Sequence, residues 1–295
     1  MPLVSSRAEA SQTAVITGAS SGIGRSYARE LAARGYDLLI TGRRAEKLTA
    51  LREELEAGRR ISVTTRVVEL SDRHALSELV GEVAALEQPA VLVNNAGFGR
   101  STPFAADDID EQLAMEIVHV EAVLRLTHAV LPRMTEHGAG WIINVASLAA
   151  YLPLPRGAVY GCSKLSTIAF TESLALELAN TGIRFQALAP GFTHTDFHRG
   201  PQYEGFDTRN RGLVRWMQPE DVVRTSISAI ERGRRLVCVP GLANRIVYGI
   251  AKCLPRRLLR AMMAAARPAA GTPAAADTPA AGDSAARGSD SQEDA

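Results

Sequence analysis

Cysteine is scarce in this sequence, and long apolar runs are missing. The 295 residues include three cysteines, Cys162, Cys238 and Cys253, an odd number with no CxxC spacing. This pattern excludes a disulfide framework or a cysteine-rich zinc site and indicates reduced thiols. No run of about 18 apolar residues could span a membrane, and residues 1–12 lack the apolar segment of a secretory signal. We therefore expect a cytoplasmic chain.

Charge of one sign is not in excess either. The formal net charge is +1, so the overall balance gives no argument for a nucleic-acid partner. The histidines, His194 and His198 among them, have no clustered ligand partners in the sequence, and no metal site is expected. The apolar fraction of 46% is ordinary for a globular chain with a sizeable core.

Strand and helix patterns alternate to about residue 266, which favours one α/β domain over residues 13–241. A flexible arm over 1–12 and a disordered tail over 267–295, rich in Ala, Pro, Gly and Ser, are expected at the two ends. The patterns predict helices over 45–57, 72–86, 158–180 and 219–232, and a long helix from about 109 that Pro132 kinks or ends.

Three glycines follow the first expected strand, TAVIT at 13–17. They are Gly18, Gly22 and Gly24, and apolar residues then recur at helical spacing. Such a turn lets backbone N–H groups approach a pyrophosphate, and the helix N-terminus faces the negative charge. The spacing is not GxGxxG, and a turn that merely connects two elements is the alternative. Its place between a strand and a helix favours a phosphate site.

The second strand, DLLIT at 37–41, is followed by Arg43 and Arg44 with no carboxylate beside them. In dinucleotide-binding folds an acidic residue here binds a ribose 2′-hydroxyl, whereas arginine accommodates a 2′-phosphate. Guanidinium groups make charge-assisted bonds to phosphate. Solvated residues at a helix start are the alternative, but cations oppose the helix dipole there. The pattern favours NADP(H) over NAD(H).

Ser147, Tyr160 and Lys164 form the third feature. Tyr160 and Lys164 stand four residues apart and share a helix face. A nearby ammonium favours tyrosinate and brings the phenol towards the range of general acid–base catalysis. Ser147 follows the fifth expected strand, where its hydroxyl could bond a substrate oxygen. Each residue alone would more often be structural, but in a parallel sheet all these motifs meet at its carboxyl edge.

Together these residues resemble the short-chain dehydrogenase/reductase family. TGASSGIG at 17–24, NNAG at 94–97, Ser147, YGCSK at 160–164 and PGFTHT at 190–195 match its motifs in order and spacing. The resemblance covers roughly residues 12–240. It implies a Rossmann-type, doubly wound parallel sheet of about seven strands, and hydride transfer between a nicotinamide and a carbonyl or alcohol carbon. It also implies subunit pairing through the fourth and fifth helices, in a homodimer or homotetramer.

The resemblance also implies residue roles. Tyr160 would be the acid–base group and Ser147 would polarise the carbonyl, while Lys164 would hold the nicotinamide ribose and lower the pKa of Tyr160. The remaining cofactor-binding positions would be Gly18, Ser20, Ser21, Gly22, Ile23 and Gly24 at the phosphates, Glu69 and Leu70 at the adenine, Asn95, Ala96 and Gly97 beside the adenosine and ribose, and Pro190, Gly191, Phe192, Thr193 and Thr195 near the carboxamide or phosphates.

Two positions depart from the family pattern. His119 stands where the family often has an asparagine that holds a water in a proton relay. A histidine can still bond water, but unlike asparagine it can gain or lose a proton near neutral pH. A buried core histidine is the alternative. Glu69 stands where an aspartate usually meets the adenine, which would shift that contact slightly.

The loop over 190–218 is the candidate substrate lid, because loops of this length are usually functional. An irregular surface excursion is the alternative. Its aromatic content favours a lipophilic carbonyl substrate, steroid-like or fatty-acyl. The large apolar residues of this loop are Phe192, Phe197, Tyr203, Phe206, Trp216 and Met217.

Residues 242–266 predict two basic amphipathic helices separated by Pro255. One apolar stripe consists of Leu242, Ile246, Val247, Ile250 and Leu254, and the other of Leu258, Leu259, Met262 and Met263. Packing on the domain or on a second subunit is the favoured interpretation. The alternative is peripheral contact with the inner face of a membrane.

The resulting hypothesis is an NADP(H)-dependent reductase of a lipophilic ketone or aldehyde, or the reverse alcohol dehydrogenase. Two other functions stay open: an NADP-binding sensor or scaffold without turnover, and a membrane-surface protein that acts through residues 242–266.

Overall fold

The computed structural model describes residues 12–198, 209–210, 212–233 and 235–265. Most of the arm over 1–12, the tail over 267–295, and Tyr203 and Phe206 of the candidate lid lie outside these residues. The described strands are β1 Thr13–Ile16, β2 Asp37–Gly42, β3 Val63–Val67, β4 Pro89–Asn94, β5 Gly140–Val145, β6 Ile183–Leu188 and β7 Val237–Cys238. The α-helices are α1 Gly22–Ala33, α2 Ala45–Glu56, α3 Arg73–Ala84, α4 Ile109–Glu116, α5 Ala122–His137, α6 Ala158–Glu177, α7 Pro219–Glu231, α8 Leu242–Cys253 and α9 Arg256–Ala265.

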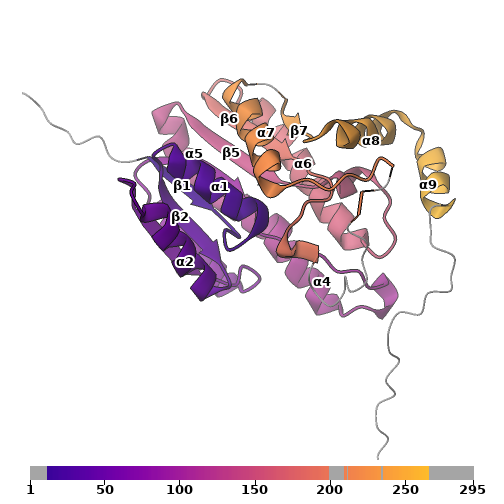
Figure 1. The fold of residues 1–295 in the computed structure, drawn as a ribbon, viewed down its shortest axis with the longest axis horizontal. Helices are drawn as coiled ribbons and strands as arrows, with labels where there is room; N and C mark the ends of the chain where they lie inside the picture. The colour runs from indigo at the N-terminus through magenta and orange to yellow at the C-terminus, as the bar shows by residue number, and fades with distance from the viewer. Residues whose placement is uncertain (1–11, 199–208, 211, 234, 266–295) are drawn as a thin grey trace, which may run out of the picture.

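The seven strands form one parallel sheet in the order β3-β2-β1-β4-β5-β6-β7. The chain begins at the middle of the sheet, winds outward to β3, then returns past β1 to build the other half (Figure 1). The fold class predicted from the sequence, a doubly wound sheet of the Rossmann type, is confirmed. The order reverses between β1 and β4, and ligands bind at the carboxyl end of the sheet at such a switch point.

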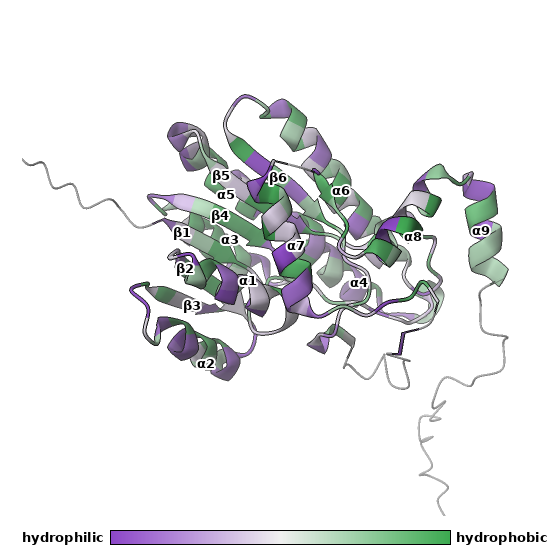
Figure 2. Ribbon diagram, turned by 45° about the horizontal axis from the view of Figure 1, so that its top comes forward, coloured by the Kyte–Doolittle hydropathy of each residue, from purple (hydrophilic) through white to green (hydrophobic). Residues whose placement is uncertain are grey.

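Helices cover both faces of the sheet. Residues of α1, α2 and α7 pack on one face, and residues of α3, α5 and α6 pack on the other. A parallel sheet buried on both sides needs strands that are apolar throughout. The central strands accordingly show long hydrophobic stretches in Figure 2, while hydrophilic residues gather on the outer sides of the helices.

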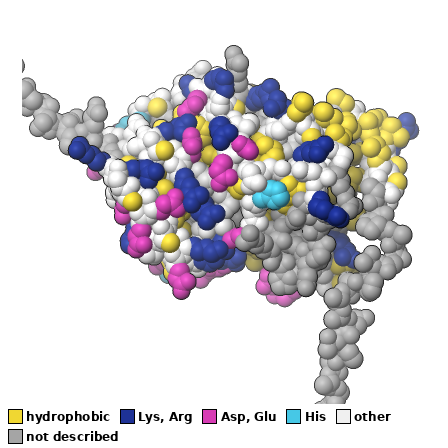
Figure 3. All heavy atoms as spheres, in the orientation of Figure 1, with side chains coloured by type: hydrophobic (Ala, Val, Ile, Leu, Met, Phe, Trp, Pro, Cys, Tyr) yellow, Lys and Arg dark blue, Asp and Glu magenta, His cyan; other side chains and the backbone are white. Residues whose placement is uncertain are grey.

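The two C-terminal helices lie beyond β7, at one end of the molecule (Figure 1). The buried residues of α8 are Asn244 and Ala251, and that of α9 is Leu259. The predicted apolar stripes point largely elsewhere, and hydrophobic side chains gather on the surface at this end (Figure 3). None of the described helices combines the length and the apolar character that crossing a membrane requires.

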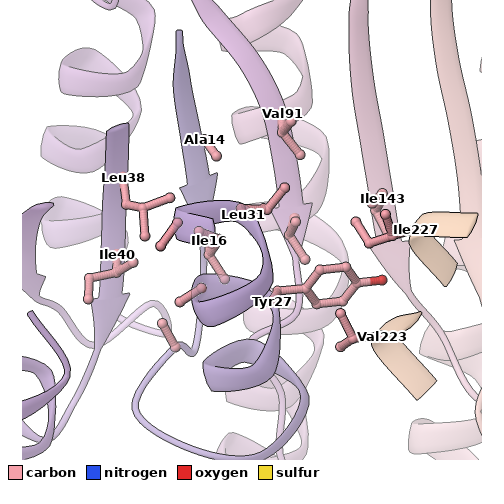
Figure 4. Close-up of a cluster of buried hydrophobic side chains, with 14 of the residues drawn as sticks. Ala14, Ile16, Tyr27, Leu31, Leu38, Ile40, Val91, Ile143, Val223 and Ile227 are labelled. Atoms are coloured by element: carbon pink, nitrogen blue, oxygen red, sulfur yellow. The ribbon is translucent and has the colours of Figure 1, made fainter. Parts of the chain in front are cut away.

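Tyr27 of α1 is the largest fully buried side chain in the core between the sheet and helices α1, α2 and α7. Its ring lies among apolar residues of β1, β4, β5 and α7 (Figure 4). Its hydroxyl donates to Ser226 Oγ at 2.5 Å, and Ser226 in turn donates to the Gln186 side chain. A buried hydroxyl needs such a partner, so this pair ties α1 to α7 and β6.

The long helix predicted from about residue 109 is interrupted, but not where the sequence suggested. α4 ends at Glu116, a π turn follows over Ile117–Glu121, and α5 runs from Ala122 to His137. Pro132 lies inside α5 and does not end it. Proline costs the helix one hydrogen bond, and the burial of Val130 and Met134 on either side holds the helix together across that gap.

Candidate active site

The glycine turn between β1 and α1 has a shape that side chains would obstruct. Gly18 and Gly22 have φ of +67° and +54°, in the left-handed region that favours glycine. A Cβ at Gly18 would lie 2.8 Å from Ala96 Cα, and one at Gly22 would lie 2.7 Å from Thr195 Cγ2. Ser21 begins α1 without capping it, and the first turn contains no carboxylate. The open helix N-terminus therefore fits a bound phosphate.

Asn95 and Ala96 hold that turn in place. Asn95 Nδ2 donates to Thr17 O at 2.9 Å and to Gly18 O at 3.2 Å, and the backbone N–H groups of Asn95 and Ala96 both donate to Thr17 Oγ1. The NNAG segment after β4 thus fixes the glycine turn after β1, and Gly97 follows between that turn and α6.

Arg44, after β2, lies beside the same turn. Its guanidinium donates to Ser20 Oγ at 3.1 Å and Ser21 Oγ at 2.8 Å. It also pairs with Asp196 at 2.9 Å, and Lys47 approaches the same carboxylate at 3.0 Å. The two cations hold the pKa of Asp196 below its usual range, chiefly through the hydrogen bond from Lys47. A carboxylate of the candidate lid therefore lies between Arg44, of the predicted 2′-phosphate site, and Lys47 of α2.

Arg43 pairs with Glu69, their nearest N and O atoms being 3.3 Å apart. Burial acts to raise the pKa of Glu69, but hydrogen bonds from Ser71 and the charge of Arg43 lower it on balance. Arg43, Glu69 and Ser71 line a cleft of about 490 Å³ that extends to Phe98 and Arg100. No carboxylate stands next to these arginines in the sequence, but in the folded chain Glu69 and Asp196 approach them from other segments.

Ser147, Tyr160 and Lys164 meet at the end of β5. Ser147 begins a 3₁₀ turn, η3 Leu148–Tyr151, and its Oγ accepts from Ala149 N at 3.1 Å. The Ser147 hydroxyl lies near enough to the Tyr160 phenol to lower the pKa of that group. Lys164 is buried, its Nζ donates to Val145 O at 3.0 Å, and it lies 5.8 Å from the centroid of the Tyr160 ring.

Burial dominates the proton affinities of this group. It raises the pKa of Tyr160, which the Ser147 hydroxyl lowers only in part. It also lowers the pKa of Lys164 to about 8. The sequence led us to expect that Lys164 lowers the pKa of Tyr160. In this structure desolvation outweighs any such effect, and the pKa of Tyr160 is raised rather than lowered.

His119, in the π turn, is buried and bonded at both ring nitrogens. Phe98 N–H donates to Nε2 at 3.2 Å, so the proton of the neutral ring lies on Nδ1, 2.9 Å from Ser163 Oγ. Ser163 Oγ itself donates to Tyr160 O at 2.9 Å. Burial, and then the charge of Lys164, lower the pKa of His119. The ring therefore ties the Gly97–Phe98 segment to α6, with both nitrogens committed to protein atoms.

The candidate lid has its described aromatic residues in two groups. Phe192 and His194 each stack on Trp216, with centroids 5.1 and 5.0 Å apart. Phe197 instead contacts Tyr160, with centroids 5.8 Å apart. Thr193 pairs with Met217 in a short parallel bridge. Thus Phe197 faces the predicted catalytic tyrosine, while Phe192 and Trp216 stabilise the loop itself.

Two expected cofactor residues point mainly into the core. Leu70 is buried in the core on the α3, α5 and α6 side of the sheet, and Ile23 packs against the core on the α1, α2 and α7 side. Pro190 O accepts from Leu148 N at 3.0 Å, which joins the lid's first residue to η3. Gly191 is packed by Asn244 of α8, since a Cβ there would meet Asn244 Oδ1 at 2.5 Å.

The comparisons with known proteins agree with this geometry. A family model described as short chain dehydrogenase matches residues 12–202. The chain belongs to the short-chain dehydrogenase family. The family comprises oxidoreductases that use nicotinamide cofactors.

Several relatives of this family member are similar over much of their length. A sulfoacetaldehyde reductase 2 of Chromohalobacter salexigens is 40% identical over 191 residues, which cover 63% of this chain and 75% of the relative. An uncharacterized oxidoreductase of Myxococcus xanthus is 33% identical over 254 residues, 85% of this chain and 95% of the relative.

Among solved structures, a short-chain dehydrogenase from Sphingobium yanoikuyae in complex with NADPH has a TM-score of 0.74 and 27% identity, covering 90% of this chain and 98% of that one. A bulky-bulky ketone specific alcohol dehydrogenase from Comamonas testosteroni has a TM-score of 0.71 and 26% identity, covering 88% and 97%.

In this family member three further residues lie at the site without having been predicted. Asp196 bridges Arg44 and Lys47, and Arg100 and Arg156 line a small cavity beside Tyr160. Arg100 is bound to Asp107 and Glu111. Nothing in the spacing of these residues marks them, because their roles depend on which loops come together. In the part of the chain that the structure describes, no group of three His, Cys, Asp or Glu residues could hold a metal ion.

Proposed function

We propose that this chain interconverts a carbonyl and an alcohol with NADP(H) as the cofactor, within the class of oxidoreductases that act on CH–OH donors. The observation that carries the proposal is the meeting of Ser147, Tyr160 and Lys164 beside the glycine turn. The open N-terminus of α1 and the Arg43–Arg44 pair fit a phosphorylated dinucleotide. A nicotinamide bound there supplies or accepts the hydride.

The chain's own residues handle the proton. Because burial raises the pKa of Tyr160, its hydroxyl carries a proton at neutral pH and suits donation to a carbonyl oxygen. Ser147 Oγ, beside the same phenol, can turn its proton to that oxygen and stabilise its developing charge. Lys164 supplies a buried positive charge that favours the tyrosinate left behind.

His119 enters this proposal as a positioning residue. Both of its ring nitrogens are bonded to protein atoms, so it holds Ser163 and, through it, the backbone of Tyr160. A relay through a water on His119 would need one of these bonds to open.

Purified chain, NADPH and a panel of ketones and aldehydes test the reaction. Tyr160→Phe should lower turnover roughly 100- to 10,000-fold, the loss expected on removing an acid–base group, and leave NADPH binding within about twofold. Tyr36→Phe is the matched control, because Tyr36 packs against the core away from the site. Full activity of Tyr160→Phe would refute the mechanism. NADPH binding without turnover of any carbonyl would instead favour the sensor function.

For the substrate we propose a lipophilic ketone or aldehyde. Phe197 beside Tyr160 supports an apolar contact at the reacting carbon, and the structural relative named for bulky ketones supports the same class. A small anionic aldehyde is the second candidate. The cavity beside Tyr160 is lined by Arg100 and Arg156, and a relative is named as a sulfoacetaldehyde reductase. Arg156→Ala should leave kcat/KM unchanged for apolar ketones and lower it only for anionic aldehydes.

We also propose a homodimer or homotetramer formed through α4, α5 and α6. Large apolar side chains on these helices are exposed, namely Leu113, Leu124, Leu165 and Leu176. A contact between two copies of the chain would cover them. Light scattering of the purified chain measures the mass directly, and a monomer at micromolar concentration would refute this proposal.

A further inference from the structure

The exposed side of α8 is apolar. Leu242, Ile246 and Ile250 follow one another at four-residue spacing and therefore share one face. Leu242 is 71% exposed and Ile246 is 44% exposed. The buried residues Asn244 and Ala251 lie on the opposite face, against the domain. In a helix on the surface of a globular protein the apolar stripe normally faces the core, so α8 shows the reverse arrangement.

α9 continues this surface. Leu258 and Met262 are 49% and 53% exposed, whereas Leu259 is buried against the rest of the chain. Hydrophobic side chains form a broad area at the end of the molecule where Figure 1 places α8 and α9 (Figure 3). The segment 242–265 contains no aspartate or glutamate, and its cations are Arg245, Lys252, Arg256, Arg257 and Arg260.

On α8 the positive charges lie along one edge of the apolar stripe, where Lys252 Nζ also lies over the Tyr151 and Tyr248 rings. Helical geometry sets each residue 100° from the last, so Arg245 lies about 60° from Leu242 and about 100° from Ile246 on the exposed side of the helix. On α9 the arginines at 256, 257 and 260 fall on one side and Leu258 and Met262 on the other. We call the apolar surface of Leu242, Ile246, Ile250, Leu258 and Met262, with the five cations carried by the same two helices, the α8–α9 face.

A second copy of the chain does not suit the α8–α9 face. A twofold contact brings the same patch of both subunits together, which would crowd the cations of two such segments with no carboxylate of either segment to compensate. The exposed leucines of α4, α5 and α6 are a separate surface for subunit pairing. Nucleic acid would match the charge but not the apolar stripe, because its phosphate backbone offers polar contacts.

We propose that the α8–α9 face docks on a membrane surface that contains anionic phospholipid. The apolar stripe would enter the boundary between headgroups and acyl chains, and the arginines would meet lipid phosphates. Both helices would lie in the plane of the surface, since neither is long enough to cross it.

The packing of α8 connects this face to the active site. Tyr248 of α8 contacts Tyr151 of η3 edge to face, with centroids 4.8 Å apart, and η3 begins directly after Ser147. Asn244 fills the space beside Gly191. Docking would therefore hold the segments that bear Ser147 and Gly191 next to the lipid, where a lipophilic carbonyl compound is concentrated. This last step rests on the proposed function, whereas docking itself does not.

Co-sedimentation of the full chain with vesicles tests docking. We expect binding to phosphatidylcholine vesicles that contain phosphatidylglycerol, and at least tenfold weaker binding to phosphatidylcholine alone or at high salt. Two variants remove one contribution each: Ile246→Ser with Met262→Ser, and Arg256→Gln with Arg257→Gln and Arg260→Gln. Each should weaken binding at least tenfold.

Matched controls carry the same kinds of change elsewhere. They are Val67→Ser with Leu213→Ser, both exposed apolar residues outside α4, α5 and α6, and Arg52→Gln with Arg60→Gln and Arg224→Gln. Both controls should bind vesicles like the unaltered chain. No binding to anionic vesicles, or an equal loss of binding in variants and controls, would overturn the proposal. A fall in oligomer mass for the Ile246→Ser, Met262→Ser variant would also overturn it, because it would assign the face to a second copy of the chain. NADPH oxidation measured without vesicles reports on the proposed function separately.

Discussion

Replacing Arg44 by alanine tests the choice between NADPH and NADH most directly. Arg44 lies beside the glycine turn, bonded to Ser20 and Ser21, which is where a 2′-phosphate on the adenosine ribose would arrive. NADH lacks that phosphate. Removing the guanidinium should therefore weaken NADPH binding and leave NADH binding almost unchanged.

The expected size follows from the surroundings of the guanidinium. A hydrogen bond to a charged group contributes about 1.5–3 kcal/mol. The Arg44 side chain is 41% exposed, and in the free chain it already pairs with Asp196, so the lower end of that range applies. A loss of about 1.5–2 kcal/mol corresponds to an increase of roughly 10- to 30-fold in KM for NADPH. The KM for NADH should change by less than about twofold.

Steady-state kinetics with each cofactor and one carbonyl substrate measure the effect. Two further variants sharpen the test. Arg43→Ala should raise KM for NADPH less, because Arg43 is 66% exposed and pairs with Glu69 at 3.3 Å. Asp196→Asn removes the carboxylate that competes for Arg44 and should lower or preserve KM for NADPH. An equal rise in KM for both cofactors in Arg44→Ala, or no rise for either, would refute the assignment of this site.

Three other predictions concern buried polar groups. Lys164→Met should change the pH dependence of stability. The pKa of Lys164 is about 8 in the folded chain and 10.5 in the unfolded chain, so the unfolded state binds more protons between these two pH values. The unaltered chain should therefore gain stability relative to the variant as the pH rises through that range. A constant difference in urea denaturation at pH 7 and pH 10 would contradict it. His119→Leu leaves the Phe98 N–H and Ser163 Oγ without their partner and should cost about 2–4 kcal/mol; a smaller loss in His119→Gln, measured the same way, would show that the hydrogen bonds rather than the ring's bulk matter. Tyr27→Phe removes one hydroxyl while Ser226 keeps Gln186, and calorimetry should show a loss of about 1 kcal/mol; no loss would mean that the bond contributes nothing net.

Much of the architecture could be predicted because it depends on local chemistry. The buried strands, the glycines of the first turn, and the four-residue spacing of Tyr160 and Lys164 all leave a signature within a few residues of one another. Their convergence follows from one rule, that parallel strands present their carboxyl ends at one edge. The fold and the family could therefore be inferred from the sequence, and both are confirmed.

Contacts between distant segments could not be predicted in the same way. Asp196 meets Arg44 across 152 positions of the chain, and Glu69 meets Arg43 across 26. Neither partner has a local pattern, so the sequence showed two arginines without the carboxylates that accompany them. The outward orientation of the α8 apolar stripe could not be predicted for a related reason. The spacing of the apolar residues in the sequence is the same whether the stripe packs on the domain or faces away from it.

The π turn at Ile117–Glu121 explains how a histidine comes to lie beneath Gly97. Ala122 N–H donates to Ile117 O, five positions back rather than four, so the turn holds one residue more than a regular helix. Since each residue advances an α-helix by 100°, everything before the turn is rotated by about that amount relative to α5. His119 sits inside this change of phase, and its ring reaches so close to Gly97 that a Cβ there would lie 2.7 Å from Nε2. In a relative with an uninterrupted helix, a residue at a different position of the sequence would face Gly97. A sequence alignment without a gap in this helix would therefore match residues that do not occupy the same place in the two structures.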